Sequence, residues 1–381
     1  MALIRKSGRA LFILAALITS WAGHVAAEMT FVHPGALNTR ASLDFVKTRL
    51  EAGQQPWKDA FSAVQQLADA PPPPGALEYI DSTSDDASIS RDAALHAYAL
   101  ALSWYFTGDE NYARRSITIL DEWSGLKGFN AGTEQDRLQA GWIGSVFAQA
   151  AEIMRIYPGW TVDQIAGFQN MFRRAFYPQL NTPSFWNGNV DLTQIDAMIS
   201  IAVFNEDEAQ FNRALARLER RNPAYFYLSS DGRESLAIEG DRGDVDAFWS
   251  DPVHWPDGLT QETCRDNGHH AQFALGSAVH VAEVAWNQGV DVYSKNMQRY
   301  TAALELLASQ LLSGNVDSCH ETTATTSRFS TWEVGYNHYH HRSGFDLTYT
   351  QELITQQIRT PDVHASWNLA FETLTHADIS E

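Results

Sequence analysis

The chain repeats one pattern, in which two stretches of helical periodicity are joined by a link of only two or three residues. In residues 91–106 the apolar side chains recur every three or four positions, and Thr107, Gly108 and Asp109 then end that stretch and open the next. So short a link makes the two helices antiparallel neighbours. No alternating run of β-branched residues is long enough for a sheet core. The pattern occurs at residues 91–123, 133–178, 192–218 and 270–312.

This periodicity predicts an all-α fold of about a dozen helices or slightly more, built from antiparallel hairpins. Of the 381 residues, 44% are hydrophobic and 12% aromatic, so the chain is able to bury a full core. Two segments depart from the pattern. Pro71–Pro74 and the polar residues 81–90 predict a surface loop. Residues 229–267 are irregular but carry Trp249, His254 and Trp255, which predicts an ordered functional loop.

The first 27 residues have the composition of a secretory signal peptide. Arg5, Lys6 and Arg9 precede an apolar run at residues 10–21, and small residues follow at 25–27. A membrane anchor is the alternative, but the run is shorter than the roughly 20 residues that span a bilayer. We therefore expect residues 1–27 to be removed and residues 28–381 to form a single periplasmic or secreted domain without stable membrane insertion.

The formal net charge of −19 argues against nucleic acid as a partner. It becomes −22 after loss of residues 1–27, which carry three positive charges and no negative one. Nucleic acid is disfavoured as a partner, and a polyanion would be repelled at long range unless cationic side chains gather in one place. The chain has two cysteines, Cys264 and Cys319, which predict either one disulfide of an exported protein or two buried thiols. The oligomeric state is left open.

Three polar clusters interrupt the apolar pattern, and each lies in a loop or at the start of a predicted helix. They are residues 186–189 (Trp-Asn-Gly-Asn), residues 262–270 (Glu-Thr-Cys-Arg-Asp-Asn-Gly-His-His) and residues 336–342 (Tyr-Asn-His-Tyr-His-His-Arg). Such a density of ionisable groups beside apolar helices is costly unless chemistry uses it. No zinc, phosphate-binding or dinucleotide motif occurs, so we predict neither a metal nor a cofactor.

Each cluster also has a purely structural interpretation. Asparagine is a good helix cap, so Asn187 and Asn189 are candidates for capping the helix that begins near Val190. A surface ion pair between Glu262 and Arg265 would contribute almost nothing to stability. By the same reasoning His270, Tyr336 and Tyr339 are candidates for core residues, and His340 or His341 for a solvated neighbour.

Taken together, the clusters resemble the alginate lyase superfamily of polysaccharide lyases, families 5 and 38. The similarity spans about residues 90 to 360 and rests on Gly188-Asn189 with the helix after it, on the block from Glu262 to His269 with its alanine-rich helix, and on Glu333 with residues 336–339. Family 5 enzymes have a histidine where this chain has Val190, so the resemblance is closer to family 38.

The resemblance implies an incomplete α/α toroid whose cleft cuts uronic acid polymers by β-elimination, without a cofactor. In this reaction the C5 proton is removed, the adjacent carboxylate is neutralised and the departing O4 is protonated. Asn189, or Asn187 as the alternative, would neutralise the carboxylate; His269 would neutralise it or act as base; Tyr336 or Tyr339 would protonate O4. Arg265, Arg328 and Arg342 are candidates for holding carboxylates. Further candidate substrate-binding residues are Trp186, Trp249, Trp255, Glu262, His270 and His338.

The substrate expected is a β-linked polyuronate, mannuronate-containing alginate first and glucuronan as the alternative. In mannuronate and glucuronate the C5 proton and O4 lie on the same face of the sugar, whereas in guluronate they lie on opposite faces. Two other classes stay open from sequence: a glycoside hydrolase that uses Asp257, Glu262 and Asp266, and a non-catalytic glycan-binding protein that stacks sugars on Trp249 and Trp255.

Overall fold

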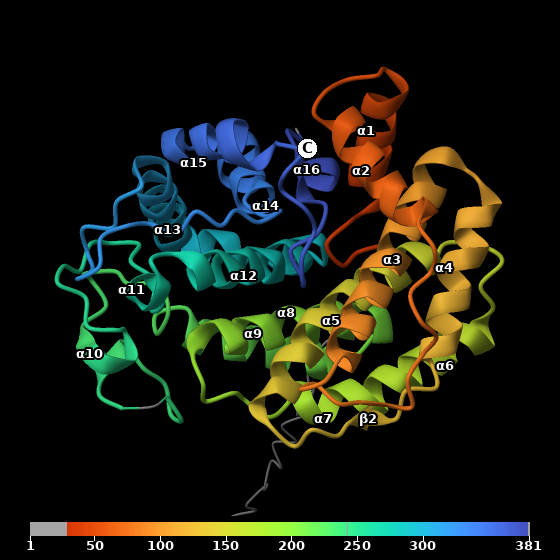
Figure 1. Ribbon diagram of the computed structural model, residues 1–381, viewed down its shortest axis with the longest axis horizontal. Helices are drawn as coiled ribbons and strands as arrows, with labels where there is room; N and C mark the ends of the chain where they lie inside the picture. The colour runs from red at the N-terminus through yellow and green to blue at the C-terminus, as the bar shows by residue number, and fades with distance from the viewer. Residues whose placement is uncertain (1–28, 242, 380–381) are drawn as a thin grey trace, which may run out of the picture.

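The computed structural model describes residues 29–241 and 243–379, which form helices and a single pair of two-residue strands (Figure 1). The strands β1 (Tyr79–Ile80) and β2 (Gly128–Phe129) are parallel. The prediction of an all-α fold is therefore confirmed, and the architecture is the α/α toroid that the resemblance implies. The predicted signal peptide, residues 1–27, lies outside the described residues.

Four long helices stand side by side and run in the same direction: α3 (Asp86–Thr107), α5 (Glu134–Met154), α8 (Gly188–Asn205) and α12 (His269–Asn287). Polar contacts between successive helices fix their register. Gln149 of α5 donates to Ser200 of α8 at 3.3 Å. The hydroxyls of Thr193 and Ser277 lie 3.4 Å apart, one turn before the contact between Asp196 of α8 and His280 of α12. We call these four the inner helices.

Each inner helix is followed by an outer helix that runs back along it: α4 (Glu110–Trp123), α6 (Val162–Met171), α9 (Glu208–Arg221) and α13 (Tyr293–Ser313). All four predicted hairpins are therefore confirmed. The links within the hairpins are short, as at Gly108, whose φ of 74° ends α3 in a left-handed turn. The long connections, residues 124–133, 172–187, 222–268 and 314–332, all lead to the amino-terminal end of an inner helix or of the segment after α13. This placement gathers loop side chains at one end of the ring.

The remaining elements cover the ends and edges of the ring. The prediction of a loop at residues 81–90 is wrong in part, because α3 already begins at Asp86 and both Ala87 and Ser90 are buried. The long segment 229–267 is irregular, as predicted, apart from single turns. The remaining helices are α1 (Arg40–Glu51), α2 (Trp57–Asp69), α7 (Tyr177–Leu180), α10 (Val245–Phe248), α11 (Thr263–Asp266), α14 (Glu333–Tyr336), α15 (Thr348–Leu353) and α16 (Glu372–His376), with π-helical turns at Phe172–Phe176, Asn337–Arg342 and Ile354–Ile358 and a 3₁₀ turn at Arg233–Ser235.

The carboxy-terminal segment joins the first and last inner helices, next to α1 and α2 (Figure 1). The ring of Phe371 packs against Tyr98 of α3, with centroids 5.4 Å apart. Glu372 contacts His280 of α12 at 2.7 Å, and His280 also contacts Asp196 of α8. One imidazole between two buried carboxylates therefore ties the end of the chain to the centre of the ring.

The charge on His280 makes the stability of the ring depend on pH. Burial alone would lower the pKa of His280, but Asp196 and Glu372 outweigh burial and raise it to about 10. Because this value exceeds the ordinary 6.5, the stabilisation is complete below pH 6.5 and is lost as the pH rises toward 10. We expect the urea midpoint of unfolding to fall across that interval. In His280→Gln the fall should be smaller, and an equal fall in both proteins would contradict this assignment.

Candidate active site

The carboxylate of Glu262 organises the polar residues at the amino-terminal end of α8. It is fully buried and accepts hydrogen bonds from the backbone N–H of Asn189 at 3.1 Å and from the amide of the same residue at 2.8 Å. The hydroxyl of Tyr225 donates to it at 2.9 Å, and the guanidinium of Arg265 donates a further hydrogen bond. Glu262 and Arg265 are thus not the surface ion pair of the structural interpretation, because one partner is inaccessible to water.

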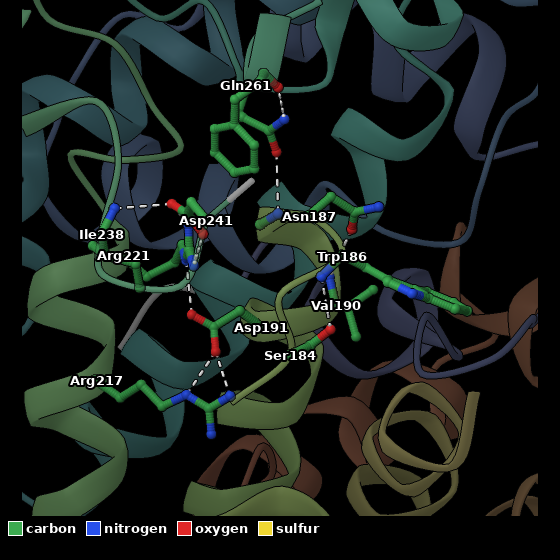
Figure 2. Close-up of polar contacts among 12 residues, drawn as sticks. Ser184, Trp186, Asn187, Val190, Asp191, Arg217, Arg221, Ile238, Asp241 and Gln261 are labelled. Carbon is green, nitrogen blue, oxygen red and sulfur yellow. Dashed lines mark hydrogen bonds and ion pairs between the residues drawn. The ribbon is translucent and has the colours of Figure 1, made fainter. Parts of the chain in front are cut away.

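These bonds decide which asparagine presents an amide N–H₂ group outward. A carboxylate only accepts hydrogen bonds, so the Asn189 nitrogen must face Glu262, and its second hydrogen is donated to Oδ1 of Asn187 at 2.9 Å. Asn187 also accepts from the backbone N–H of Val190, which makes it the cap of α8. No hydrogen bond from the nitrogen of its amide occurs within the described part of the chain, whereas its oxygen accepts from Asn189 and Val190; Figure 2 shows the bond to Val190. The exposed donor is therefore Asn187, the alternative of the sequence analysis, and Asn189 orients it.

A glycine is required at the start of α8. A Cβ atom at Gly188 would lie 2.2 Å from the ring of Tyr225, and the backbone N–H of Gly188 donates to the side chain of Gln261 at 3.1 Å. This close approach brings Tyr225 against the Glu262 carboxylate. Sequence reasoning missed Tyr225, because it lies in a run of aromatic residues that is typical of a core.

Beneath this cap, four buried charges join α8 to α9 and to the irregular segment (Figure 2). Asp191 of α8 accepts from Arg217 Nε at 2.6 Å and from Arg221 Nε at 2.7 Å. Arg221 also holds Asp241 through two bonds of 2.9 and 2.8 Å. Burial alone would raise the pKa of Asp191, but the two guanidinium groups hold it below its ordinary value, so it is ionised.

Two adjacent histidines begin α12 and lie partly exposed at the same end of the ring. Their ring centroids are 5.1 Å apart. Nδ1 of His269 contacts the hydroxyl of Ser327 at 3.1 Å. Nδ1 of His270 is hydrogen-bonded to the carboxylate of Asp266, which also accepts from the His270 backbone N–H at 3.0 Å. Each imidazole is thereby oriented through Nδ1. Burial and the neighbouring His270 lower the pKa of His269, so it is neutral near pH 7.

Aromatic side chains lie beside the histidines. Phe273 of α12 packs against Trp367 at 4.8 Å, and Trp367 packs against Trp142 of α5 at 5.5 Å. Trp142 and Trp367 remain partly exposed, and Trp186 is exposed. Trp186 was among the predicted residues but Trp142 and Trp367 were not, because nothing in the sequence distinguishes a partly exposed tryptophan inside α5, or one in the segment before α16, from a core residue.

A disulfide between Cys264 and Cys319 is present, with Cα atoms 5.1 Å apart. It fastens α11, which carries Arg265 and Asp266, to the connection after α13. This confirms the disulfide alternative of the sequence analysis. Within residues 29–241 and 243–379, no group of three or more histidine, cysteine, aspartate or glutamate side chains is arranged to hold a metal ion. None of the helices in the described part of the chain is both long and apolar enough to span a bilayer.

The third predicted cluster lies at the other end of α12. Arg342 forms two hydrogen bonds of 2.9 Å with Glu283, fourteen residues after His269 and therefore about 21 Å farther along the helix. His338 stacks on Tyr293 with ring centroids 3.5 Å apart. Tyr336 and Tyr339 are buried, as in the structural interpretation of these two tyrosines. The structure does not bring this cluster to Asn189 and His269, so a shared site with Tyr336, His338, Tyr339 and Arg342 is not found.

The variant Tyr339→Phe distinguishes a catalytic role of Tyr339 from a structural role in the core. The Tyr339 hydroxyl donates to the backbone carbonyl of Tyr293 at 3.0 Å, so its removal should cost about 1 kcal/mol of unfolding free energy. Because the hydroxyl is buried far from the histidines, we expect polyuronate turnover to be unchanged. Urea unfolding and the ultraviolet absorbance of the unsaturated product measure the two effects. A folded variant without turnover would restore the tyrosine role predicted from sequence.

Three other predicted substrate-binding residues have structural partners. Trp249 is fully buried, and its indole N–H donates to the carbonyl of Leu236 at 2.8 Å, so it forms the core of the irregular segment and is no stacking surface. Trp255 packs against it at 5.1 Å and stays partly exposed. Arg328 donates to Gln357 at 2.6 Å and to the carbonyls of residues 311, 325 and 327, which leaves it a structural role.

A sequence profile of the alginate lyase family matches residues 73–316, which is more than half of the chain. The chain belongs to the alginate lyase family. It is accordingly a polysaccharide lyase, and its substrate is an anionic polysaccharide. No curated protein matches the chain.

Solved alginate lyases share the fold of this family member. A histidine-to-alanine variant of alginate lyase A1-III complexed with a tetrasaccharide has 16% identity and a TM-score of 0.66, over 90% of this chain and 94% of that one. Alginate lyase A1-III from Sphingomonas species A1 has 16% identity and a TM-score of 0.63, over 91% and 97%. An alginate lyase from Bacteroides ovatus has 13% identity and a TM-score of 0.56, over 90% and 99%.

Membership of the alginate lyase family overturns the glycoside hydrolase alternative. The geometry also argues against a pair of hydrolase carboxylates. Glu262 is buried and surrounded by hydrogen-bond donors, and Asp257 accepts a hydrogen bond from the backbone N–H of Ser229 at 2.6 Å. A cavity of about 290 Å³ does occur, between α3, α4 and Pro72–Pro74, but none of the candidate residues lines it. The candidate site of this alginate lyase family member is therefore the amino-terminal end of α8 and α12.

Proposed function

We propose that this protein is an exported lyase that cleaves mannuronate-containing alginate by β-elimination. The observation that carries the proposal is one buried carboxylate, Glu262, which fixes the Asn187–Asn189 amide pair and Arg265 beside two partly exposed histidines. These side chains come from α8, α11 and α12, and they supply the donors and the proton acceptor that elimination needs.

The first requirement is to neutralise the uronate carboxylate, so that the C5 proton becomes acidic. Arg265 has a 41% exposed side chain, and its guanidinium is held by Glu262. Asn187 adds an amide N–H₂ group oriented through Asn189. A carboxylate bound between them would receive charge-assisted hydrogen bonds, although the net negative charge of the protein repels a polyanion at longer range. Trp186, next to Asn187, is available to pack on a sugar.

The second requirement is a base. His269 meets it as the tautomer whose Nδ1–H donates to the hydroxyl of Ser327, because its Nε2 is then available to accept the C5 proton. The lowered pKa of His269 keeps this nitrogen unprotonated near neutral pH. The family resemblance implied that His269 either neutralises the carboxylate or acts as the base, and we assign it the role of the base.

Export is part of the proposal. The predicted signal peptide at residues 1–27 supports it, and so does the Cys264–Cys319 disulfide, because such bonds persist mainly in oxidising compartments.

A substrate panel tests the proposed function. Purified protein is mixed with polymannuronate, polyguluronate and glucuronan, and the ultraviolet absorbance of the conjugated C4–C5 double bond is followed. We expect the signal with polymannuronate, and its loss in His269→Gln, with His320→Gln as a matched control at an exposed histidine. A signal with glucuronan alone would mean that the substrate is glucuronan and not alginate. No signal from any polyuronate would refute the proposal.

A further inference from the structure

We infer that His270, held by Asp266, is the group that protonates the departing O4 oxygen. This inference rests on the proposed function and assigns to a second histidine the step that sequence analysis gave to a tyrosine. The need for another donor arises because Tyr336 and Tyr339 are buried elsewhere, and the hydroxyl of Tyr225 is fully buried and already donates to Glu262.

The geometry of His270 is that of an oriented acid. Asp266 accepts both the Nδ1–H and the backbone N–H of His270, so the ring cannot rotate freely. The side chain of His270 is 33% exposed, which leaves Nε2 as the nitrogen able to reach a substrate. Its ring lies 5.1 Å from that of His269, and both rings pack on Phe273.

The two rings have different polar neighbours. Burial alone would raise the pKa of Asp266, but its hydrogen bonds from His270 outweigh burial and lower it, so the carboxylate is ionised and accepts the Nδ1–H of His270. Arg265 is the other ionised group beside the pair. Ser327 is the polar contact of His269 from the segment after α13, whereas the neighbouring Arg328 turns away to Gln357.

The step balances with these two rings. Nε2 of His269 takes the C5 proton, the C5–H electrons form the C4–C5 double bond, and the C4–O4 bond breaks as Nε2–H of His270 delivers its proton to O4. His269 ends charged and His270 neutral, and exchange with water restores both. No oxidant, metal or other reactant is consumed.

Because adjacent residues of one helix carry both groups, the base and the acid approach the sugar from the same side. Same-side elimination fits mannuronate and glucuronate, whose C5 proton and O4 share a face, and does not fit guluronate. The pair therefore predicts turnover of polymannuronate over polyguluronate.

A leaving group that departs without a proton tests the inference. The substrates are polymannuronate and a mannuronoside that carries a nitrophenoxy group at C4. We expect His270→Gln to lower kcat on the polymer by about 10²- to 10⁴-fold with little change in KM, and to leave the rate on the nitrophenoxy compound near that of the wild type. His269→Gln should lose both activities. Asp266→Asn should resemble His270→Gln with a smaller loss, as expected of a positioning residue.

The outcomes separate the two proposals. Wild-type cleavage of polymannuronate together with full activity of His270→Gln, or with equal losses on both substrates, overturns the role of His270 and leaves the lyase proposal intact. Absence of wild-type cleavage of any polyuronate removes both. Circular dichroism melting of each variant, beside His320→Gln, identifies a loss that comes from unfolding.

Discussion

Glu262→Gln should abolish most of the lyase activity although it changes one oxygen to nitrogen. The new amide must direct its N–H₂ toward one of the donors that now surround Glu262, so at least one contact with Asn189, Tyr225 or Arg265 becomes repulsive. Without a fixed Asn189, the Asn187 amide loses its orientation, and Arg265 loses its ion pair. We expect kcat/KM on polymannuronate to fall by about 10²-fold, comparable to the loss of one preorganised donor in other enzymes.

The same variant should lose about 1–3 kcal/mol of unfolding free energy, because a buried amide donor is left facing another donor. Urea unfolding and initial ultraviolet rates measure the two losses. Glu321→Gln, at an exposed glutamate, is the matched control and should match the wild type in both. Wild-type rates in Glu262→Gln would remove the buried carboxylate from the account of the site.

Asp191→Asn should be the most destabilising of the conservative variants. It leaves Arg217 and Arg221 buried with only Asp241 as a charged partner, and Arg217 then lacks an ionised one (Figure 2). Breaking a buried pair from one side typically costs about 3–5 kcal/mol, since the remaining charge has neither water nor a counter-ion. Because Asp191 lies one turn below Asn187 on α8, activity should fall as well.

Guanidinium unfolding of Asp191→Asn measures this cost, and Glu219→Gln provides the comparison. Glu219 pairs with Lys295 at 3.1 Å, but both side chains are about 70% exposed, so its loss should leave the unfolding midpoint nearly unchanged. Similar midpoints in the two variants would mean that the Asp191 network does not hold α8 in place.

The fold was predictable because its signal is local and repeated. Apolar positions every three or four residues, with links such as residues 107–109 and 205–207, specify hairpins without any knowledge of distant contacts. The boundary error at residues 81–90 has a tertiary cause, because burial of Ala87 against the ring extends α3 into a polar stretch.

The site was predictable only in part, because the composition of a polar cluster does not reveal at which end of the ring its side chains lie. The first two polar clusters lie at the starts of α8 and α12, and the parallel inner helices bring these starts together. The third cluster precedes no inner helix, and its side chains pack against the far end of α12, where Glu283 and Tyr293 are their partners. Nor does the sequence indicate that Trp249 would be needed as the core of its own loop.

The position of Glu372 has a consequence for biosynthesis. Asp196 and His280 sit at the middle of the ring, yet Asn368 and Glu372, which complete their contacts, follow them in the chain by 172 and 92 residues and are therefore synthesised much later. Until then the nascent polypeptide holds an incompletely satisfied polar centre, which disfavours early compaction. Such a delay would suit the export proposed above, because a polypeptide that crosses a membrane through a translocon has to stay unfolded until it has passed.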